Sequence, residues 1–199
     1  MDSGQGLIVC SGYSKNPSME ILPTEITDVL LLKPRVFGDD RGFFFESWNK
    51  KTFSAAVGRP TEFVQDNYSR SSRGVLRGLH HQVAPSTQGK LVAVLAGSIF
   101  DVAVDLRPNS ASFGSHVGFE LSVEQRTMIW IPPGFAHGFL VMSESADVQY
   151  KTTEFYSPAH ERCLRWDDPV LNIPWPLSGT APILSSKDDK GVAFVDTKF

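Results

Sequence analysis

The sequence predicts an all-β protein built as an antiparallel sandwich or barrel. About ten short stretches of apolar and β-branched residues follow one another along the chain, with Gly, Pro, Asp and Asn between them. Only one short stretch has helical character. Many short strands at close intervals are typical of sandwiches and barrels.

Length and composition favour one domain without a disulfide or metal staple. The chain has 199 residues, and domains of this size bury roughly 70 % of their unfolded surface. Two cysteines, Cys10 and Cys163, are too few for a disulfide framework and fit a reduced, cytoplasmic compartment. The net charge of −3 argues against nucleic-acid binding, and no apolar run approaches the roughly 18 residues of a membrane helix.

The N-terminus differs from the rest of the chain. Residues 1–19 are rich in Gly and Ser, show no periodicity and lack the build of a signal peptide. We therefore expect a flexible leader over 1–19, with Met19 as a candidate natural start, and a single domain over 20–199.

The predicted elements follow from local patterns. A Gly-Asp-Asp-Arg-Gly turn between apolar runs predicts a hairpin over 36–49, and residues 50–57 predict the one helix, ended by Gly58. Apolar or alternating runs predict the strands 28–32, 75–82, 91–95, 98–106, 116–121, 127–131, 135–142, 147–153 and 162–166, with a polar loop over 84–89 and an aperiodic tail over 167–199.

The two predicted strands 91–95 and 98–106 flank Ala96-Gly97, which predicts that they pair with each other. Alternation in the second strand predicts that it is half buried. One face would carry Phe100, Val102, Val104 and Leu106, and the other Asp101, Ala103, Asp105 and Arg107.

The strand over 75–82 carries more polar groups than a structural strand needs. Alternation places Arg77 and His81 on one face and His80 and Gln82 on the other. A bulge at Gly78 would bring Arg77 and His80 to the same side. Because unpaired buried polar groups are costly, this strand end is expected to face a polar cavity. One histidine bonded to a backbone carbonyl and one in solvent is the open alternative.

Metal binding is not expected. A metal-binding jelly roll of the cupin type would use His-x-His and a downstream carboxylate, whereas His80 and His81 are adjacent and followed by Gln82. A metal-free cavity fits better, with His80 as base, Lys90 as cation and Tyr150 as acid. Arg41 and Arg77 would clamp an anion. Each of these side chains also has an ordinary structural interpretation, as a solvated lysine, a strand tyrosine or an exposed turn arginine.

Several long motifs, in fixed order from about Ile26 to Asp189, resemble the dTDP-4-dehydrorhamnose 3,5-epimerase family. They are VFGDDRGFFFESWN, FVQDNYSRSSRGVLRGLHHQ, QGKLVAVLAGSIFDVAVDLR, WIPPGFAHGF, DDPVLNIPWP and LSSKD. The resemblance implies a cupin-like antiparallel jelly roll, usually a homodimer. It also implies an isomerase that works without metal or cofactor on dTDP-4-keto-6-deoxyhexoses.

The resemblance also implies roles for individual residues. His80 matches the base, Tyr150 the general acid, Lys90 the lysine near the enolate oxygen, and Asp188 the aspartate paired with the catalytic histidine. Substrate contacts carry over to Arg41, Glu46, Gln65, Asn67, Arg77, His137, Glu161 and Lys187. Phe155 departs from the pattern, because related sequences often carry a second tyrosine before Tyr156.

The implied reaction converts dTDP-4-dehydro-6-deoxy-D-glucose to dTDP-4-dehydro-L-rhamnose, and its chemistry suits these residues. The C3 and C5 protons both lie next to the C4 ketone, so removing either gives an enolate that a fixed cation stabilises. Neutral histidine is a suitable base near pH 7, and an adjacent carboxylate orients it. Inversion needs a separate acid on the opposite face, and arginines suit a diphosphate.

Three alternatives stay open at this point. The chain could invert only C3 or only C5 of a nucleotide sugar in a deoxysugar pathway. It could be a metal-dependent cupin oxygenase or isomerase, which bound iron, manganese or zinc would reveal. It could also be a non-catalytic jelly roll that binds the sugar without exchanging its protons.

Overall fold

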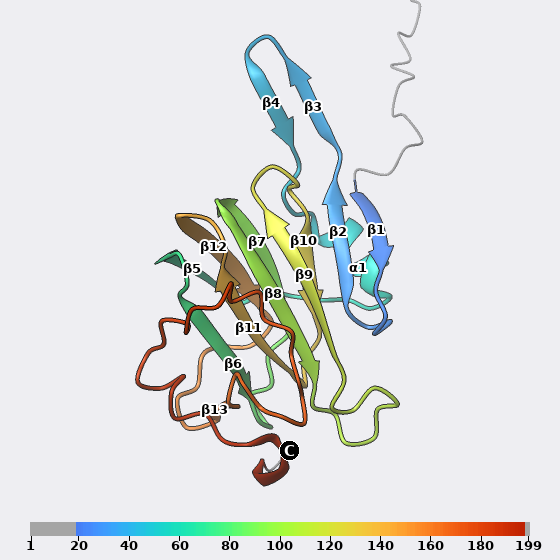
Figure 1. Ribbon diagram of the computed structural model, residues 1–199. Helices are drawn as coiled ribbons and strands as arrows, with labels where there is room; N and C mark the ends of the chain where they lie inside the picture. Colours follow the sequence, from blue (N-terminus) through green and yellow to red (C-terminus); the bar gives the residue numbers. More distant parts are fainter. Residues whose placement is uncertain (1–18, 198–199) are drawn as a thin grey trace, which may run out of the picture.

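Two antiparallel sheets packed face to face form the body of the protein (Figure 1). The structure is a computed structural model and describes residues 19–197. One sheet has six strands in the order β1-β2-β10-β7-β12-β5, and the other has five in the order β13-β6-β11-β8-β9. Strands β3 and β4 form a separate hairpin. The predicted all-β jelly-roll sandwich is therefore confirmed.

The strands are short, and one helix accompanies them. Their bounds are β1 (Met19–Pro23), β2 (Leu30–Pro34), β3 (Val36–Asp39), β4 (Gly42–Phe45), β5 (Gln65–Ser72), β6 (Leu76–Gln82), β7 (Lys90–Ala96), β8 (Ser98–Asp105), β9 (His116–Ser122), β10 (Met128–Ile131), β11 (Phe135–Val141), β12 (Ser145–Thr152) and β13 (Glu161–Cys163). The helix is α1 (Lys50–Val57), and a short 3-10 turn covers Phe194–Asp196.

The helix and the hairpin form where local sequence predicts them. Asn49 caps the start of α1 by accepting hydrogen bonds from the backbone nitrogens of Lys51 and Thr52. Gly58 ends the helix in the left-handed conformation, with φ 75°. The buried Phe53 then packs edge-on against Trp130, with ring centroids 5.1 Å apart, which fastens α1 to the outer face of the six-stranded sheet.

Strands β7 and β8 do not pair with each other, which corrects the prediction for 91–95 and 98–106. β7 pairs with β10 and β12, whereas β8 pairs with β11 and β9 in the opposite sheet. Gly97 has φ 72°, and an added Cβ there would lie 2.1 Å from the Ser145 carbonyl oxygen. At this close approach the chain passes from one sheet into the other, and each strand buries a face in the shared core.

Alternation predicted that β8 is buried on one face only. In the structure it is buried on both faces. Its inward face joins the core between the sheets, which includes Ile99 and Ala103. Its outward face lies under the C-terminal tail, where Val102 and Val104 pack with Leu171, Trp175 and Phe194. The tail runs across the outer side of the five-stranded sheet in Figure 1. The C-terminal tail, which has no periodic pattern, therefore forms a second hydrophobic core with the outer face of the five-stranded sheet.

Two strands were not predicted from the sequence, β1 and β5. β5 is polar throughout, yet its residues alternate in burial and pair with β12 as an edge strand. β1 begins at Met19, a buried residue that closes the predicted leader. The rest of that leader, residues 1–18, lies outside the described part of the chain. Within the described residues, no helix is long and apolar enough to cross a membrane.

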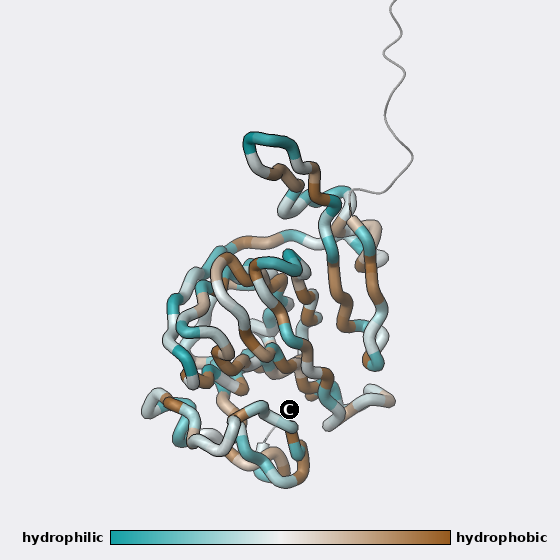
Figure 2. Tube along the Cα trace, turned by 45° about the horizontal axis from the view of Figure 1, so that its top comes forward, coloured by the Kyte–Doolittle hydropathy of each residue, from teal (hydrophilic) through white to brown (hydrophobic). Residues whose placement is uncertain are grey.

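The β3–β4 hairpin stands away from the sandwich, and its turn is hydrophilic (Figures 1 and 2). Three of its phenylalanines are exposed: Phe37 by 51 %, Phe43 by 59 % and Phe44 by 70 %. At its base, Phe43 and Phe45 border an apolar cleft of about 230 Å³, which the outer face of β7 completes with Leu91 and Leu95. Exposed aromatic surface of this kind is typical of interaction faces.

Candidate active site

A polar cavity of about 380 Å³ opens between the two sheets. One wall comes from β5, β7 and β12 of the six-stranded sheet, and the other from β6, β11 and β13 of the five-stranded sheet. The side chains that line it include most of the predicted site residues: Gln65, Asn67, Arg77, His80, Lys90, His137, Tyr150 and Glu161. The sandwich fold thus brings together residues from six strands.

The predicted bulge in β6 is confirmed. His80 pairs with His137 and Arg77 with Phe139, so two residues of β6 oppose the single residue Gly138 of β11. A Cβ on Gly78 would lie 2.5 Å from the Cα of Gly138, and the φ of Gly78 is 126°. Only glycine fits there. The extra residue brings Arg77 and His80 to the same wall of the cavity.

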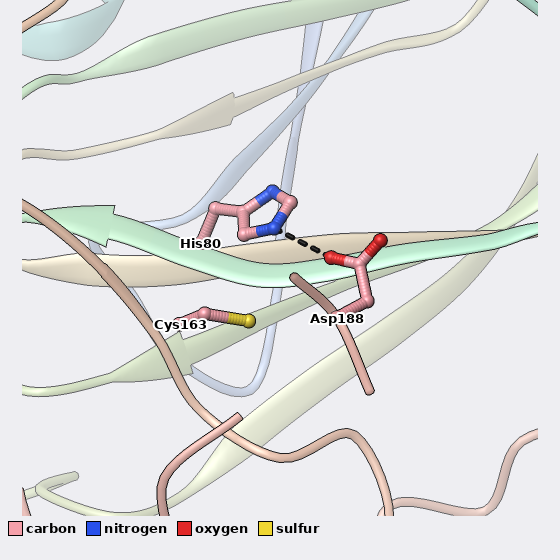
Figure 3. A group of neighbouring side chains, drawn as sticks. All are labelled: His80, Cys163 and Asp188. Carbon is pink, nitrogen blue, oxygen red and sulfur yellow. Dashed lines mark ion pairs between the residues drawn. The ribbon is translucent and has the colours of Figure 1, made fainter. Parts of the chain in front are cut away.

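His80 and Asp188 form a pair on the cavity wall (Figure 3). His80 Nε2 lies 2.6 Å from Asp188 Oδ1, and the side chains are 28 % and 5 % exposed. Asp188 also accepts hydrogen bonds from Ser185 Oγ at 2.6 Å and from the backbone nitrogen of Gly78 at 3.3 Å. Burial raises the pKa of Asp188, but the bonds from His80 and Ser185 outweigh it and hold that pKa at about 2. The carboxylate is therefore ionised and lies beside Nε2, which favours the tautomer with its proton on Nε2 and a lone pair on Nδ1.

Lys90 and Tyr150 face this pair from the other sheet. Lys90 is 8 % exposed, and its Nζ donates a hydrogen bond to the His80 carbonyl oxygen at 3.3 Å. Burial lowers the pKa of Lys90 to about 8, although Asp101 and Glu161 act in the opposite direction. Burial raises the pKa of Tyr150, so its phenol stays protonated at neutral pH. The cavity therefore brings together an imidazole, an ammonium group and a phenol, which are groups able to act as a base, a cation and a proton donor.

A second histidine–aspartate pair lies deeper in the same sheet. His137 Nε2 is 2.8 Å from Asp101 Oδ2, and the side chains are 6 % and 0 % exposed. Burial lowers the pKa of His137, with Asp101 acting against it. Asp101 was not predicted as a site residue. The available signal was a carboxylate in the middle of an otherwise apolar strand, which needs a buried partner.

A cluster of polar side chains surrounds Glu161 at the edge of the cavity. Tyr156 donates its hydroxyl hydrogen to Glu161 Oε2 at 2.6 Å, and Lys187 forms an ion pair with the other oxygen of Glu161. Gln82 was predicted only as a strand residue, yet its amide nitrogen donates to the Phe155 carbonyl oxygen at 3.2 Å and its amide oxygen accepts from the backbone nitrogen of Ser157 at 2.7 Å. These contacts fasten the loop that carries Tyr156.

Three predicted substrate contacts are not part of the cavity lining: Lys187 borders it only through its ion pair with Glu161, and two others lie apart from it. Arg41 is in the turn of the β3–β4 hairpin, where its side chain is 89 % exposed and pairs with Asp39 at 2.6 Å. Glu46 follows β4 and accepts a hydrogen bond from Asn49 Nδ2 at 3.1 Å. Within one chain, neither residue reaches the cavity lining.

The two adjacent histidines differ in their partners. His81 also borders the cavity, but its buried ring nitrogens have no hydrogen-bond partner among the described residues. Burial, followed by the charges of Lys90, Arg162 and His80, lowers the pKa of His81 to about 4. His81 therefore lacks the oriented carboxylate that His80 has.

Comparisons with known proteins agree with this geometry. A family model described as dTDP-4-dehydrorhamnose 3,5-epimerase matches residues 23–196. A Pseudomonas aeruginosa protein of that name is 60 % identical over 171 residues, covering 86 % of this chain and 93 % of the relative. A Legionella pneumophila dTDP-6-deoxy-D-glucose-3,5-epimerase, solved in complex with dTDP-4-keto-L-rhamnose, has a TM-score of 0.87 at 48 % identity, covering 90 % of this chain and 95 % of the other.

A structural neighbour at lower sequence identity is named as an epimerase of a single position. The 3'-monoepimerase from Streptomyces bikiniensis, solved in complex with dTDP-quinovose, has a TM-score of 0.80 at 30 % identity. The match covers 86 % of each chain. The same fold therefore accompanies both double and single epimerases.

Proposed function

The chain belongs to the dTDP-4-dehydrorhamnose 3,5-epimerase family and is an isomerase, and from this premise we propose which residues carry its reaction. The substrate is dTDP-4-dehydro-6-deoxy-D-glucose, which is inverted at C3 and C5 to give dTDP-4-dehydro-L-rhamnose. The observation that carries the residue assignment is the 2.6 Å contact of His80 with Asp188 at a cavity that also holds Lys90 and Tyr150.

His80 is the base that removes a proton next to the C4 ketone. Its Nε2–H faces the ionised Asp188, so the lone pair on Nδ1 is the one available for proton transfer. When Nδ1 takes the proton, the imidazolium cation is stabilised by the adjacent carboxylate. Asp188 itself is anchored by Ser185 and Gly78, which keeps the imidazole ring in one orientation.

Lys90 stabilises the enolate that forms when the proton leaves. Negative charge develops on the C4 oxygen, and a buried, fixed cation stabilises such charge more strongly than water does. The hydrogen bond from Lys90 Nζ to the His80 carbonyl oxygen places the ammonium group beside the base. A pKa near 8 keeps most of Lys90 protonated at neutral pH.

Tyr150 delivers the new proton from the opposite face. It belongs to β12 of the six-stranded sheet, whereas His80 belongs to β6 of the five-stranded sheet. The acid and the base therefore stand on opposite walls of the cavity, which is what inversion at carbon requires. The raised pKa of Tyr150, caused by burial, keeps its proton available.

The remaining cavity residues bind the nucleotide sugar. Arg77 is exposed to the cavity and supplies a planar guanidinium that suits a diphosphate. Gln65 and Asn67, which hydrogen-bond each other at 2.8 Å, present amides from β5. His137, Glu161 and Lys187 complete the set of proposed substrate contacts.

We further propose a homodimer in which the hairpin serves the partner's cavity. Arg41 and Glu46 match substrate contacts of the family but lie outside the cavity of their own chain. The hairpin projects from the body and exposes Phe37, Phe43 and Phe44, which a second copy would cover. Arg41 would then reach the cavity of the other subunit.

Mixed dimers test this arrangement. Co-expression of Arg41→Ala with His80→Asn gives heterodimers in which one cavity has an intact His80 and receives Arg41 from its neighbour. We expect this mixture to recover activity that neither variant has alone. A mixture no more active than the sum of its parts, or a strictly monomeric protein at micromolar concentration, would contradict the proposal.

Proton NMR in deuterated buffer tests the proposed reaction itself. With dTDP-4-dehydro-6-deoxy-D-glucose as substrate, the protein should incorporate solvent deuterium at C3 and C5 and yield L-configured product. Binding without exchange would instead identify a non-catalytic sugar-binding jelly roll. Exchange at one carbon only would identify a single-position epimerase, the second candidate, an activity that the same fold carries in the Streptomyces bikiniensis 3'-monoepimerase.

We place the reaction in the cytoplasm and assign it no metal cofactor. The free thiol of Cys163 fits a reducing compartment. Elemental analysis of the purified protein tests the second point, because one tightly bound iron, manganese or zinc per chain that activity requires would identify a metal-dependent cupin enzyme instead.

A further inference from the structure

Cys163 stands beside the His80–Asp188 pair, and none of the proposed catalytic steps uses it. Its Sγ, a ring nitrogen of His80 and a carboxylate oxygen of Asp188 all lie within 4.8 Å of one another (Figure 3). We propose that these three side chains form an inhibitory site for a thiophilic divalent metal of the Zn²⁺ class. The inhibitory part of this inference rests on the proposed role of His80 as base.

Three separate segments hold the ligands in place. Cys163 in β13 is the direct cross-strand partner of His80 in β6, so their side chains share one face of the sheet. Asp188 comes from the C-terminal tail and is anchored by Ser185 Oγ at 2.6 Å. Because the backbone pairing fixes two ligands and a hydrogen bond fixes the third, little conformational freedom is lost when a metal binds.

The donor set selects the kind of metal. Thiolate and imidazole are ligands of Zn²⁺ and its neighbours, whereas Mg²⁺ and Ca²⁺ require oxygen ligands. A tetrahedral Zn²⁺ places its nitrogen and sulfur ligands about 3.5 Å apart, at bond lengths of about 2.0–2.3 Å. The present 2.6 Å contact between His80 and Asp188 would open, and the sulfur would move inward. Three protein ligands leave one tetrahedral position for water, as in catalytic zinc sites.

Metal binding would disable the base by moving its proton. The thiol of Cys163 weakly donates to the Leu164 carbonyl oxygen at 3.5 Å, and this proton is released to solvent when the sulfur binds the metal. His80 Nε2 faces Asp188 and so carries the imidazole proton in the active tautomer. Coordination through Nε2 shifts that proton to Nδ1. The neutral ring then has no free lone pair with which to accept a proton from the substrate.

Cobalt spectroscopy on the full chain tests the site without any substrate. Cys10, the only other cysteine in the sequence, is first replaced by serine. We expect one Co²⁺ per chain, a thiolate-to-Co²⁺ charge-transfer absorption, and displacement by Zn²⁺ but not by Mg²⁺. Adding Cys163→Ser should abolish the absorption and weaken Zn²⁺ binding roughly 100-fold or more. Absence of the absorption in the Cys10→Ser protein overturns the site, whatever the stability of the Cys163 variant.

Turnover measurements test the inhibition separately. Activity of the Cys10→Ser protein should fall in proportion to Zn²⁺ occupancy and return with a chelator, while the Cys163→Ser protein should keep its activity at the same free Zn²⁺ concentration. Equal inhibition of both proteins overturns the proposal. Full turnover by the metal-loaded protein overturns the inhibition and contradicts His80 as base, whereas failure to bind the metal leaves the assignment of His80 standing.

Discussion

The five-stranded sheet carries two histidine–aspartate pairs with similar geometry and different surroundings. His80–Asp188 and His137–Asp101 have contacts of 2.6 Å and 2.8 Å. The side chain of His80 is 28 % exposed at the cavity, whereas that of His137 is only 6 % exposed and its aspartate is fully buried. The same two residue types thus meet in a partly exposed setting and in a fully buried one.

This difference in burial suits the His80–Asp188 pair to proton transfer and the His137–Asp101 pair to a structural role. A base must become charged during the reaction, and a solvated pair supports that change at a lower cost than a buried one. The buried pair suits a fixed neutral histidine, because burial lowers the pKa of His137. Breaking a buried pair leaves an uncompensated charge, which is strongly destabilising. We therefore expect substitution of His80 to cost mainly activity, and substitution of His137 to cost stability in addition to the substrate contact proposed for it.

His80→Asn should have the largest effect on activity. Loss of the base should slow both deuterium exchange and epimerisation by at least about 10²–10⁴-fold. Stability should fall by no more than about 1.5–3 kcal/mol, because Asp188 loses one partner but keeps its bonds from Ser185 and Gly78. The matched control is His81→Asn, which should lose much less activity. Near-normal turnover by the His80 variant would refute the assignment.

Tyr150→Phe should separate exchange from inversion. His80 still removes the proton and Lys90 still holds the enolate, but the donor on the opposite wall is gone. Deuterium should enter C3 or C5 with retained configuration, while L-configured product falls by about 10²–10⁴-fold. One NMR time course reports both quantities. If exchange and inversion fall by the same factor, Tyr150 is not the dedicated acid.

His137→Leu should lower stability more than His80→Asn does. The buried carboxylate of Asp101 would lose its partner, which we expect to cost about 3–5 kcal/mol in the free energy of unfolding. Urea denaturation of both variants measures the contrast. The double replacement of His137 and Asp101 by leucine should restore part of the loss, since no unpaired buried carboxylate remains, although Lys90 loses the attraction of Asp101. Equal destabilisation by the single and double variants would show that the pair itself is unimportant.

Arg77→Ala should weaken substrate binding and leave both histidine–aspartate pairs intact. Its guanidinium is assigned to the diphosphate, remote from C3 and C5, so a charge-assisted hydrogen bond worth about 1.5–3 kcal/mol is lost. The affinity of the protein for its product, measured by a binding titration, should fall by the corresponding factor. KM for the substrate should rise, and kcat should change little. An unaltered affinity would remove Arg77 from the binding site.

The smallest predicted effect is a pH dependence set by Lys90. Its pKa is lowered to about 8 by burial, and the active form is the protonated one. As pH rises through 8 the cation is lost, so kcat should fall about tenfold per pH unit above that value. Lys90→Arg keeps a cation over this range and should lack the alkaline decline, even at reduced activity. A wild-type profile flat to pH 10 would show that the charge of Lys90 does not limit the reaction.

Local patterns in the sequence determined part of this structure. The helix over 50–57, its end at Gly58, the hairpin over 36–49 and the bulge at Gly78 all follow from rules that act within a few residues. The resemblance of long motifs identified many of the residues that meet in the cavity, although Arg41 and Glu46 lie outside it. Each of these features depends on backbone preferences or on a contiguous motif, which one sequence displays directly.

Only the tertiary structure decided which distant residues meet. His80 and Asp188 are far apart in the sequence, and Asp101 and Cys163 became site neighbours because β8 and β13 lie in the same sheet as β6 and β11. The passage of the chain from β7 to the opposite sheet, the polar strand β5 and the tail over the outer face had no periodic signal. Such features depend on long-range packing, where the burial of one segment is set by whatever covers it and not by its own residues.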